Sequence, residues 1–232
     1  MKVLKIKNII KFKTLTRIIK FRYQKNYIIN ILIIGLREIR LKTKDNDEIL
    51  KLHENLIELH EQLRNNKKKK WDRVLPFEEL LFDRWEKAEF LKAKKNASVY
   101  HSSNIFGKVE IGKNAWIGPY TILDGSGGRI KIGEFCSISS GVQIYTHDTV
   151  EWSLTGGKAE FEKGGVTIGD NCYVGPNVII SKGVKIGKGC IIGANSFVNR
   201  NIPQYSIAYG IPAKKTGNVK ITKDKIKLEY LK

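Results

Sequence analysis

The sequence has few cysteines, few histidines and no long apolar run. Its 232 residues include three cysteines and four histidines. An odd cysteine count without a secretory signal argues against a disulfide framework and predicts thiols in a reducing cytoplasm. The apolar stretch 27–36 has ten residues and contains Asn30, well short of the roughly 20 residues that span a bilayer. No small-residue cleavage site comes after it, so we expect neither a transmembrane helix nor a cleaved signal peptide.

Acidic residues are scarce at one end of the chain. The formal net charge is +19, and residues 1–44, with nine lysines and four arginines against one glutamate, carry +12 of it. Ile, Leu and Phe are interleaved with these cations, which predicts a helix with a basic face. Such a helix suits an anionic membrane surface, and a solvated helical hairpin that packs on its own chain fits equally well. No zinc-finger, homeodomain or RNA-binding signature is present, so we expect no nucleic-acid partner.

Residues 45–98 have helical patterns. Within 45–66 the apolar residues are spaced alternately by three and four, which predicts a short heptad seam on one helix. Packing on the chain's own body competes with self-association through so short a seam. The lysine-rich stretch 65–70 predicts a solvated linker, and 76–95 a second helix whose apolar side chains pack on the domain after it. The seam residues are Ile49, Leu52, Leu56, Leu59 and Leu63, and those of the second helix are Leu80, Leu81, Trp85 and Leu91.

From residue 99 the apolar pattern has a period of six. A glycine often comes directly after the aliphatic residue, and a small or apolar residue comes four places later. This predicts a coil of parallel strands, one short strand per hexad and three per turn, with the aliphatic side chains stacked inside. Cys136, Cys172 and Cys190 occupy the small position, so we expect them to fill the core. The aliphatic positions are Val99, Ile105, Ile111, Ile117, Leu123, Ile132, Ile138, Ile144, Ile168, Val174, Ile180, Ile186, Ile192 and Val198.

The stretch 166–214, "VTIGDNCYVGPNVIISKGVKIGKGCIIGANSFVNRNIPQYSIAYGIPAK", resembles the C-terminal half of hexapeptide-repeat acyltransferases. The resemblance covers residues 99–215 and is closest to the sugar O-acetyltransferases and nucleotide-amino-sugar N-acetyltransferases of bacterial surface-glycan synthesis. It implies a mainly β fold, a left-handed parallel β-helix, assembled as a homotrimer with acyl-coenzyme A in grooves between subunits. We therefore expect an α-helical N-terminal region, an acyltransferase domain over 99–215 and a C-terminal tail over 216–232.

Two insertions interrupt the period of six. About twenty residues are added at 145–166, and three between Leu123 and Ile132, one turn earlier. Because loops on rigid scaffolds often carry function, we expect both breaks to face one cleft. His147 opens the longer loop where members of the family keep their general base, and an imidazole, which titrates near neutral pH, suits that role. Asp148, or another carboxylate that the fold brings near, is expected to orient the ring, and backbone N–H groups to stabilise the oxyanion.

The remaining site residues fall into an acceptor group and a donor group. We expect the acceptor near His147, bound by Asp124, Tyr145 and Trp152. The resemblance implies that the arm of coenzyme A lies along Tyr173, Gly175, Gly193 and Ala194, with Asn199 nearby and Lys214 and Lys215 at the phosphates.

The leading prediction is an acetyl-CoA-dependent acetyltransferase that acts on a sugar hydroxyl by direct transfer, without a metal. The alternatives are N-acyl transfer to a nucleotide-linked amino sugar and a non-catalytic β-helical scaffold, which would not need His147. A metal hydratase on the same fold needs several histidine ligands, and the repeat domain has only His101 and His147. The expected location is the cytoplasm, with residues 1–44 as a peripheral contact to the inner face of the membrane.

Overall fold

The computed structural model describes residues 46–223 and 225–231. The chain divides into two compact units, 1–59 and 60–232, and in the first only residues 46–59 are described. The predicted basic segment 1–44 and its membrane contact lie outside the described residues. The helices within the described residues are α3 (Asn46–Trp71), α4 (Glu78–Leu81), α5 (Arg84–Phe90) and α6 (Val150–Leu154).

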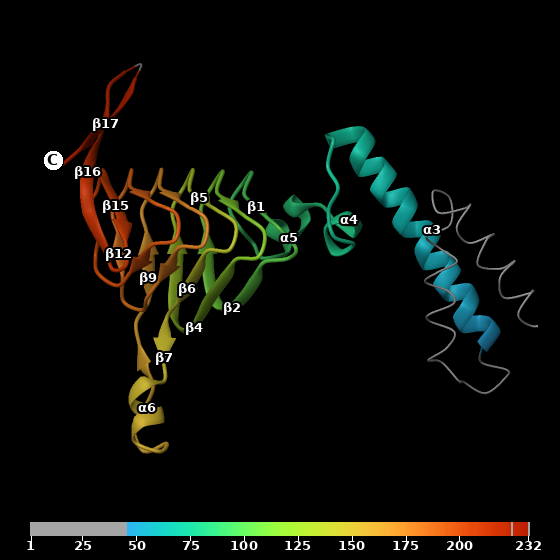
Figure 1. Cartoon of the computed structure of the whole chain (residues 1–232), viewed down its shortest axis with the longest axis horizontal. Helices are drawn as coiled ribbons and strands as arrows, with labels where there is room; N and C mark the ends of the chain where they lie inside the picture. Colours follow the sequence, from blue (N-terminus) through green and yellow to red (C-terminus); the bar gives the residue numbers. More distant parts are fainter. Residues whose placement is uncertain (1–45, 224, 232) are drawn as a thin grey trace, which may run out of the picture. The chain divides into compact units, whose positions relative to one another are not determined.

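The second unit is built mainly of short parallel strands stacked along one axis (Figure 1). In chain order they are β1 (Ser98–Val99), β2 (Asn104–Ile111), β3 (Trp116–Ile117), β4 (Ile122–Ile132), β5 (Ser137–Ile138), β6 (Gln143–Tyr145), β7 (His147–Asp148), β8 (Glu162–Lys163), β9 (Val166–Ile168), β10 (Tyr173–Val174), β11 (Ile179–Ile180), β12 (Lys185–Ile186), β13 (Ile191–Ile192), β14 (Phe197–Val198), β15 (Ser206–Gly210), β16 (Ala213–Ile221) and β17 (Ile226–Tyr230).

Each turn of the coil contributes a strand segment to each of three faces. The first face consists of β1, β3, β5, β10, β13 and β15 in parallel. The second face starts with the first halves of β2 and β4 and continues through β6, β11 and β14. The third face consists of the second halves of β2 and β4, then β9 and β12. This is the predicted coil of parallel strands, one strand per hexad.

The core is the stack of aliphatic side chains that the period of six predicts. Each predicted inward residue is buried, apart from Ile105, which is partly buried and packs against the others. The three cysteines are buried free thiols, and each donates to a carbonyl at a neighbouring corner, such as Gly169 O at 3.0 Å from Cys136 Sγ. Their predicted role as core filler is confirmed.

The helix α3 is longer than predicted. It continues through residues 65–70 to Trp71, so the prediction of a solvated linker there is wrong. Lysine is a good helix former, and the cations of Lys68, Lys69 and Lys70 in the last turn are favourable at the negative end of the helix dipole. Asp72, directly after the helix, has a left-handed φ of 52°, which is common at helix C-termini.

The second predicted helix is broken in two. Phe82 adopts an extended conformation after α4, and Asp83 begins α5 by accepting a hydrogen bond from Trp85 N at 3.1 Å. Leu80 is buried, while Leu81 and Trp85 remain exposed. The prediction that the apolar side chains of 76–95 all pack on the following domain is therefore wrong. From α5, Lys87 Nζ donates to His101 O at 2.8 Å and to Ser103 O at 2.6 Å, which closes the first turn of the coil.

The chain ends in an antiparallel hairpin of β16 and β17 that continues the first face through β15. The predicted boundary at residue 215 falls inside β16. The described part of residues 216–232 therefore belongs to the sheet, because its strands hydrogen-bond to the last strand of the coil.

Candidate functional site

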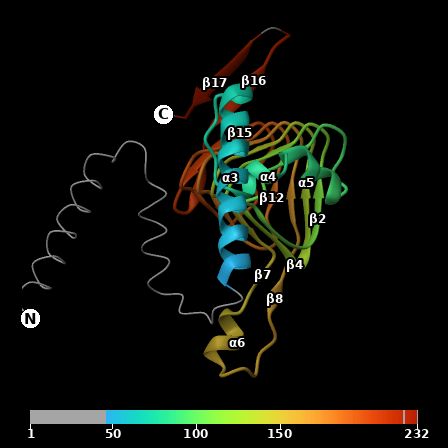
Figure 2. The same cartoon turned by 90° about the vertical axis from the view of Figure 1, so that its right-hand side faces the viewer.

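The two insertions leave the coil at the same corner, between the second and third faces, in consecutive turns. The shorter one lies inside β4, whose Asp124 pairs with Tyr145 of β6 before it and whose Ile130 pairs with Val166 of β9 after it. The longer one contains β7, α6 and β8 and projects from the coil in both views (Figures 1 and 2). The breaks are adjacent, as the sequence predicted.

Gly127 lets the shorter insertion pass directly beside His147. A Cβ atom at Gly127 would lie 2.4 Å from His147 Cβ and 2.6 Å from Thr146 O, so no larger residue fits without displacement. The sequence analysis located the shorter insertion but not this contact. The only signal in the sequence is the density of glycines in "DGSGG".

Asp124 is the carboxylate that lies next to the His147 ring. Its Oδ2 is 3.9 Å from Nδ1, and the two side chains are 17% and 26% exposed. The Nδ1 atom is buried and has no hydrogen-bond partner. Ser126 N donates to Asp124 Oδ1 at 3.0 Å, and the Ser126 hydroxyl binds the same oxygen. The carboxylate is therefore held beside the ring, where a small rotation would close a hydrogen bond.

Thr146 fixes the backbone immediately before His147. It is fully buried, and its hydroxyl donates to Asp124 O at 2.7 Å and accepts from Gly127 N at 3.0 Å. Its own N–H donates to Asp124 O at 3.1 Å. Sequence reasoning gave this residue no role, although its hydroxyl joins the two insertions.

Asp148 does not take the orienting place expected for it. Its carboxylate binds Lys182 and accepts from Val150 N at 3.2 Å. Consecutive residues of a strand point to opposite sides, so Asp148 in β7 turns away from the side that His147 occupies. Lys182 also binds Glu162 at 2.6 Å. The Lys182 hydrogen bond lowers the pKa of Asp148, and hydrogen bonds to Asp148 and Glu162 raise the pKa of Lys182.

Two aromatic rings of the long loop extend the site. The Phe161 ring lies roughly parallel to the His147 ring, with centroids 6.4 Å apart. Trp152 meets Phe161 edge to face at 5.8 Å and is 44% exposed. Trp152 therefore contacts Phe161, and Phe161 contacts His147. The sequence analysis did not predict Phe161 as a site residue. Tyr145 adjoins Asp124 in the sheet, and its hydroxyl donates to Gln143 Oε1 at 2.9 Å.

The expected donor residues gather mainly on the first face. Tyr173 is 45% exposed on β10. A Cβ at Gly175 would lie 2.7 Å from Ala194 N, and one at Gly193 2.7 Å from Tyr209 Cβ. The successive turns of the coil that carry Gly175, Gly193 and Tyr209 therefore lie against each other. Tyr209 pairs with Lys214 across the hairpin, next to the exposed Lys215. Asn199 is exposed after β14 on the second face.

The donor group and the His147 group lie on different parts of one subunit. Among the described residues, no hydrogen bond, ion pair or ring contact joins the two groups. Among residues 46–223 and 225–231, no group of three or more His, Cys, Asp and Glu side chains could hold a metal ion. None of the helices that the structure describes is long and apolar enough to cross a membrane.

The comparisons with known proteins agree with this architecture. Residues 165–200 match the family model for the bacterial transferase hexapeptide, six repeats. A hexapeptide-repeat-containing acetyltransferase of Vibrio cholerae O1 biovar eltor, complexed with acetyl coenzyme A, superposes with a TM-score of 0.53 at 24% identity, over 71% of this chain and 90% of that one. A galactoside acetyltransferase in complex with coenzyme A gives 0.52 at 25% identity, over 66% of this chain and 79% of that one.

These matches confirm the family resemblance predicted from the sequence. The coil is a left-handed parallel β-helix in a mainly β chain, with an α-helical region before it. The chain is therefore similar to hexapeptide-repeat transferases in its repeats and in its fold.

Proposed function

We propose that the protein transfers an acetyl group from acetyl-CoA to a sugar hydroxyl in surface-glycan synthesis, with His147 as the general base. The observation that carries this proposal is the placement of His147 beside Asp124 at the corner where both insertions leave the coil. The likeness to the coenzyme A-bound galactoside acetyltransferase supports the donor and the kind of acceptor. Hydrogen bonding and packing of the coil alone would not require either insertion.

In this mechanism His147 handles the proton and no acyl-enzyme forms. Because Asp124 lies at Nδ1, it favours the tautomer that carries its proton there and leaves Nε2 free as the base. As the acceptor oxygen attacks the thioester carbonyl, Nε2 takes the hydroxyl proton. The C–S bond then breaks, and the imidazolium returns the proton to the leaving thiolate. The products are an acetyl ester and free coenzyme A, so every proton is accounted for.

We propose that the site is completed by a second subunit of a homotrimer. Outward side chains on the first and second faces include apolar residues, whereas those on the third face are polar and exposed. Apolar side chains gathered on an outer face favour an interface between subunits. The donor group lies on the first face, so a neighbouring copy would bring it to His147. The outward apolar residues are Trp116, Tyr173, Ile191, Ile122, Ile179 and Phe197, and the polar ones are Glu110, Lys131, Thr167 and Lys185.

The first test is the replacement His147→Ala, assayed by thiol release from acetyl-CoA with a panel of sugars and amino sugars. Loss of a general base should lower kcat about 10²- to 10⁴-fold with unchanged coenzyme A affinity and melting temperature, because His147 lies outside the aliphatic stack. His53→Ala, on α3, is the matched control. A variant that keeps kcat within a few-fold of wild type would exclude the mechanism, and release only with amino sugars would select N-transfer. No release with any acceptor would favour the scaffold.

A further inference from the structure

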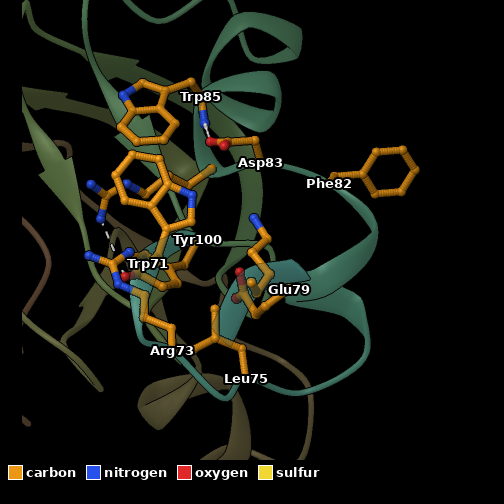
Figure 3. Close-up of a pocket in the computed structure, with 10 residues that line it drawn as sticks. Trp71, Arg73, Leu75, Glu79, Phe82, Asp83, Trp85 and Tyr100 are labelled. Atoms are coloured by element: carbon orange, nitrogen blue, oxygen red, sulfur yellow. Dashed lines mark hydrogen bonds between the residues drawn. The ribbon is translucent and has the colours of Figure 1, made fainter. Parts of the chain in front are cut away.

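A second hollow lies outside the site around His147, where α3, α4 and α5 meet the first turn of the coil. It is an open hollow with a cavity volume of about 40 Å³, so a larger ligand would lie mostly on its surface. All of its lining residues lie between Lys67 and Tyr100, so none belongs to the acceptor or donor groups. Figure 3 shows the side chains around it.

The hollow presents flat aromatic surface to solvent. Trp71 and Trp85 line it and are 45% and 43% exposed. Tyr100 also lines it, and its ring meets that of Trp116 edge to face with centroids 6.0 Å apart. The ring of Phe82 points away (Figure 3) and stacks on His101 at 5.3 Å. Two exposed indoles in one hollow suit a planar ring, because stacking on aromatic side chains tolerates any nucleobase.

The charge of the lining favours an anion. The lining contains three cations, Lys67, Arg73 and Arg84, and two carboxylates. Both carboxylates already accept hydrogen bonds within the fold. Glu79 Oε1 accepts from Ser102 N at 2.8 Å and from Ser102 Oγ at 2.6 Å, and Asp83 caps α5. Within residues 46–223 and 225–231, neither Lys67 nor Arg73 has an ion-pair partner.

Arg84 adds a donor that lacks an acceptor. Its guanidinium lies 4.5 Å from the Trp85 ring centroid and 5.6 Å from that of Tyr100, and Nη1 donates to Tyr100 Oη at 3.3 Å. The Nε atom is buried and has no hydrogen-bond partner. Such an atom calls for an explanation, since buried donors are normally paired, and a bound oxyanion would satisfy it.

We propose that this hollow binds a phosphorylated nucleoside. The base would stack on the indoles of Trp71 and Trp85, and the phosphate oxygens would accept from Arg73 and Arg84, whose planar guanidinium groups match phosphate geometry. A simple inorganic anion would leave the indoles unused, and an apolar ligand would leave the three cations unused. This site is separate from the proposed acetyl-transfer site and does not depend on that function.

The test is calorimetric titration of the full chain with UDP, ADP and inorganic pyrophosphate. Saturable nucleotide binding is expected, and Arg73→Gln should weaken it about 10- to 100-fold, as expected for loss of a charged hydrogen-bond donor. Arg73 is exposed outside the helices, so its replacement should leave the fold intact. Lys69→Gln, at an exposed position of α3 outside the lining, removes the same charge and should change nothing. Trp71→Phe should reduce the quenching of tryptophan fluorescence on titration with UDP.

Three results would overturn the proposal. One is the absence of saturable binding of either nucleotide at millimolar concentration. Another is binding that is unchanged in Arg73→Gln but lost in Lys214→Ala, because the nucleotide would then occupy the donor groove of the coil. The third is pyrophosphate binding as tight as that of UDP, together with unchanged UDP affinity in Trp71→Ala, because the base would then not contact the indoles.

Discussion

The Asp124 carboxylate lies 3.9 Å from Nδ1 of His147, near enough to stabilise positive charge on the ring. At an effective dielectric of 20 such a pair interacts by about 4 kcal/mol, and its partial exposure reduces this to about 1–3 kcal/mol. Asp124→Asn keeps the size and removes the charge, so we expect kcat to fall about 10- to 100-fold with little change in the donor KM. Steady-state kinetics with saturating acceptor measures this.

The control for that variant is Asp170→Asn, because Asp170 accepts a hydrogen bond from Glu134 N at 2.8 Å in another corner of the coil. An amide oxygen can replace the carboxylate there, so kcat should be unchanged. If Asp124→Asn turned over within twofold of wild type, Asp124 would have no part in orienting the base.

Sequence reasoning located His147 but not the groups that hold it, and the difference has a physical basis. The break in the period of six is a local signal, visible wherever the inward aliphatic residue fails to recur. Phe161 and Lys182 approach His147 and Asp148 only because the loop folds back and the next turn stacks above it. No spacing in the sequence encodes such a contact. Strand alternation turns Asp148 away from the His147 ring, and the adjacent shorter insertion brings Asp124 to it instead.

At the scale of elements, the long loop is held at its base by Lys182, which binds Asp148 of β7 and Glu162 of β8. Lys182→Met should leave these two carboxylates without their cation and loosen residues 149–163. We expect amide hydrogen exchange in that segment to speed up severalfold and kcat/KM to fall, with the coil unchanged. Lys185→Met, at an exposed position of β12, is the control. Equal exchange in both variants would refute the anchoring role.

The same anchor predicts a pH dependence. Lys182 lowers the pKa of Asp148, so the pair stabilises the loop above the unfolded value of about 3.9 and loses this contribution as the pH falls through the lower folded value. The exchange difference between wild type and Lys182→Met should therefore be constant near neutral pH and disappear in strong acid.

For the molecule as a whole, the aliphatic period of six was sufficient to predict the coil, because each inward side chain stacks on one of the same kind a turn away. Ile144 and Ile168 illustrate this, since they keep their places in the core on either side of the long insertion. The ends of the coil were harder to predict. The lysines of α3 are good helix formers, but their charge favoured the interpretation as a linker. The start of a new helix at Asp83 depends on its cap, which the spacing of apolar residues does not show.

A trimer whose sites are shared between subunits makes a prediction about mixtures. If His147 and Lys214 of one site come from different subunits, His147→Ala and Lys214→Ala variants should each be impaired alone and should rescue each other when co-expressed. In randomly mixed trimers, about one quarter of the sites would pair an intact His147 with an intact Lys214. Activity at subsaturating donor should therefore recover to about one quarter of wild type, with light scattering giving the mass of a trimer. Activity no higher than the mean of the two variants would place both residues in the same subunit, and a monomer by light scattering would overturn the shared site.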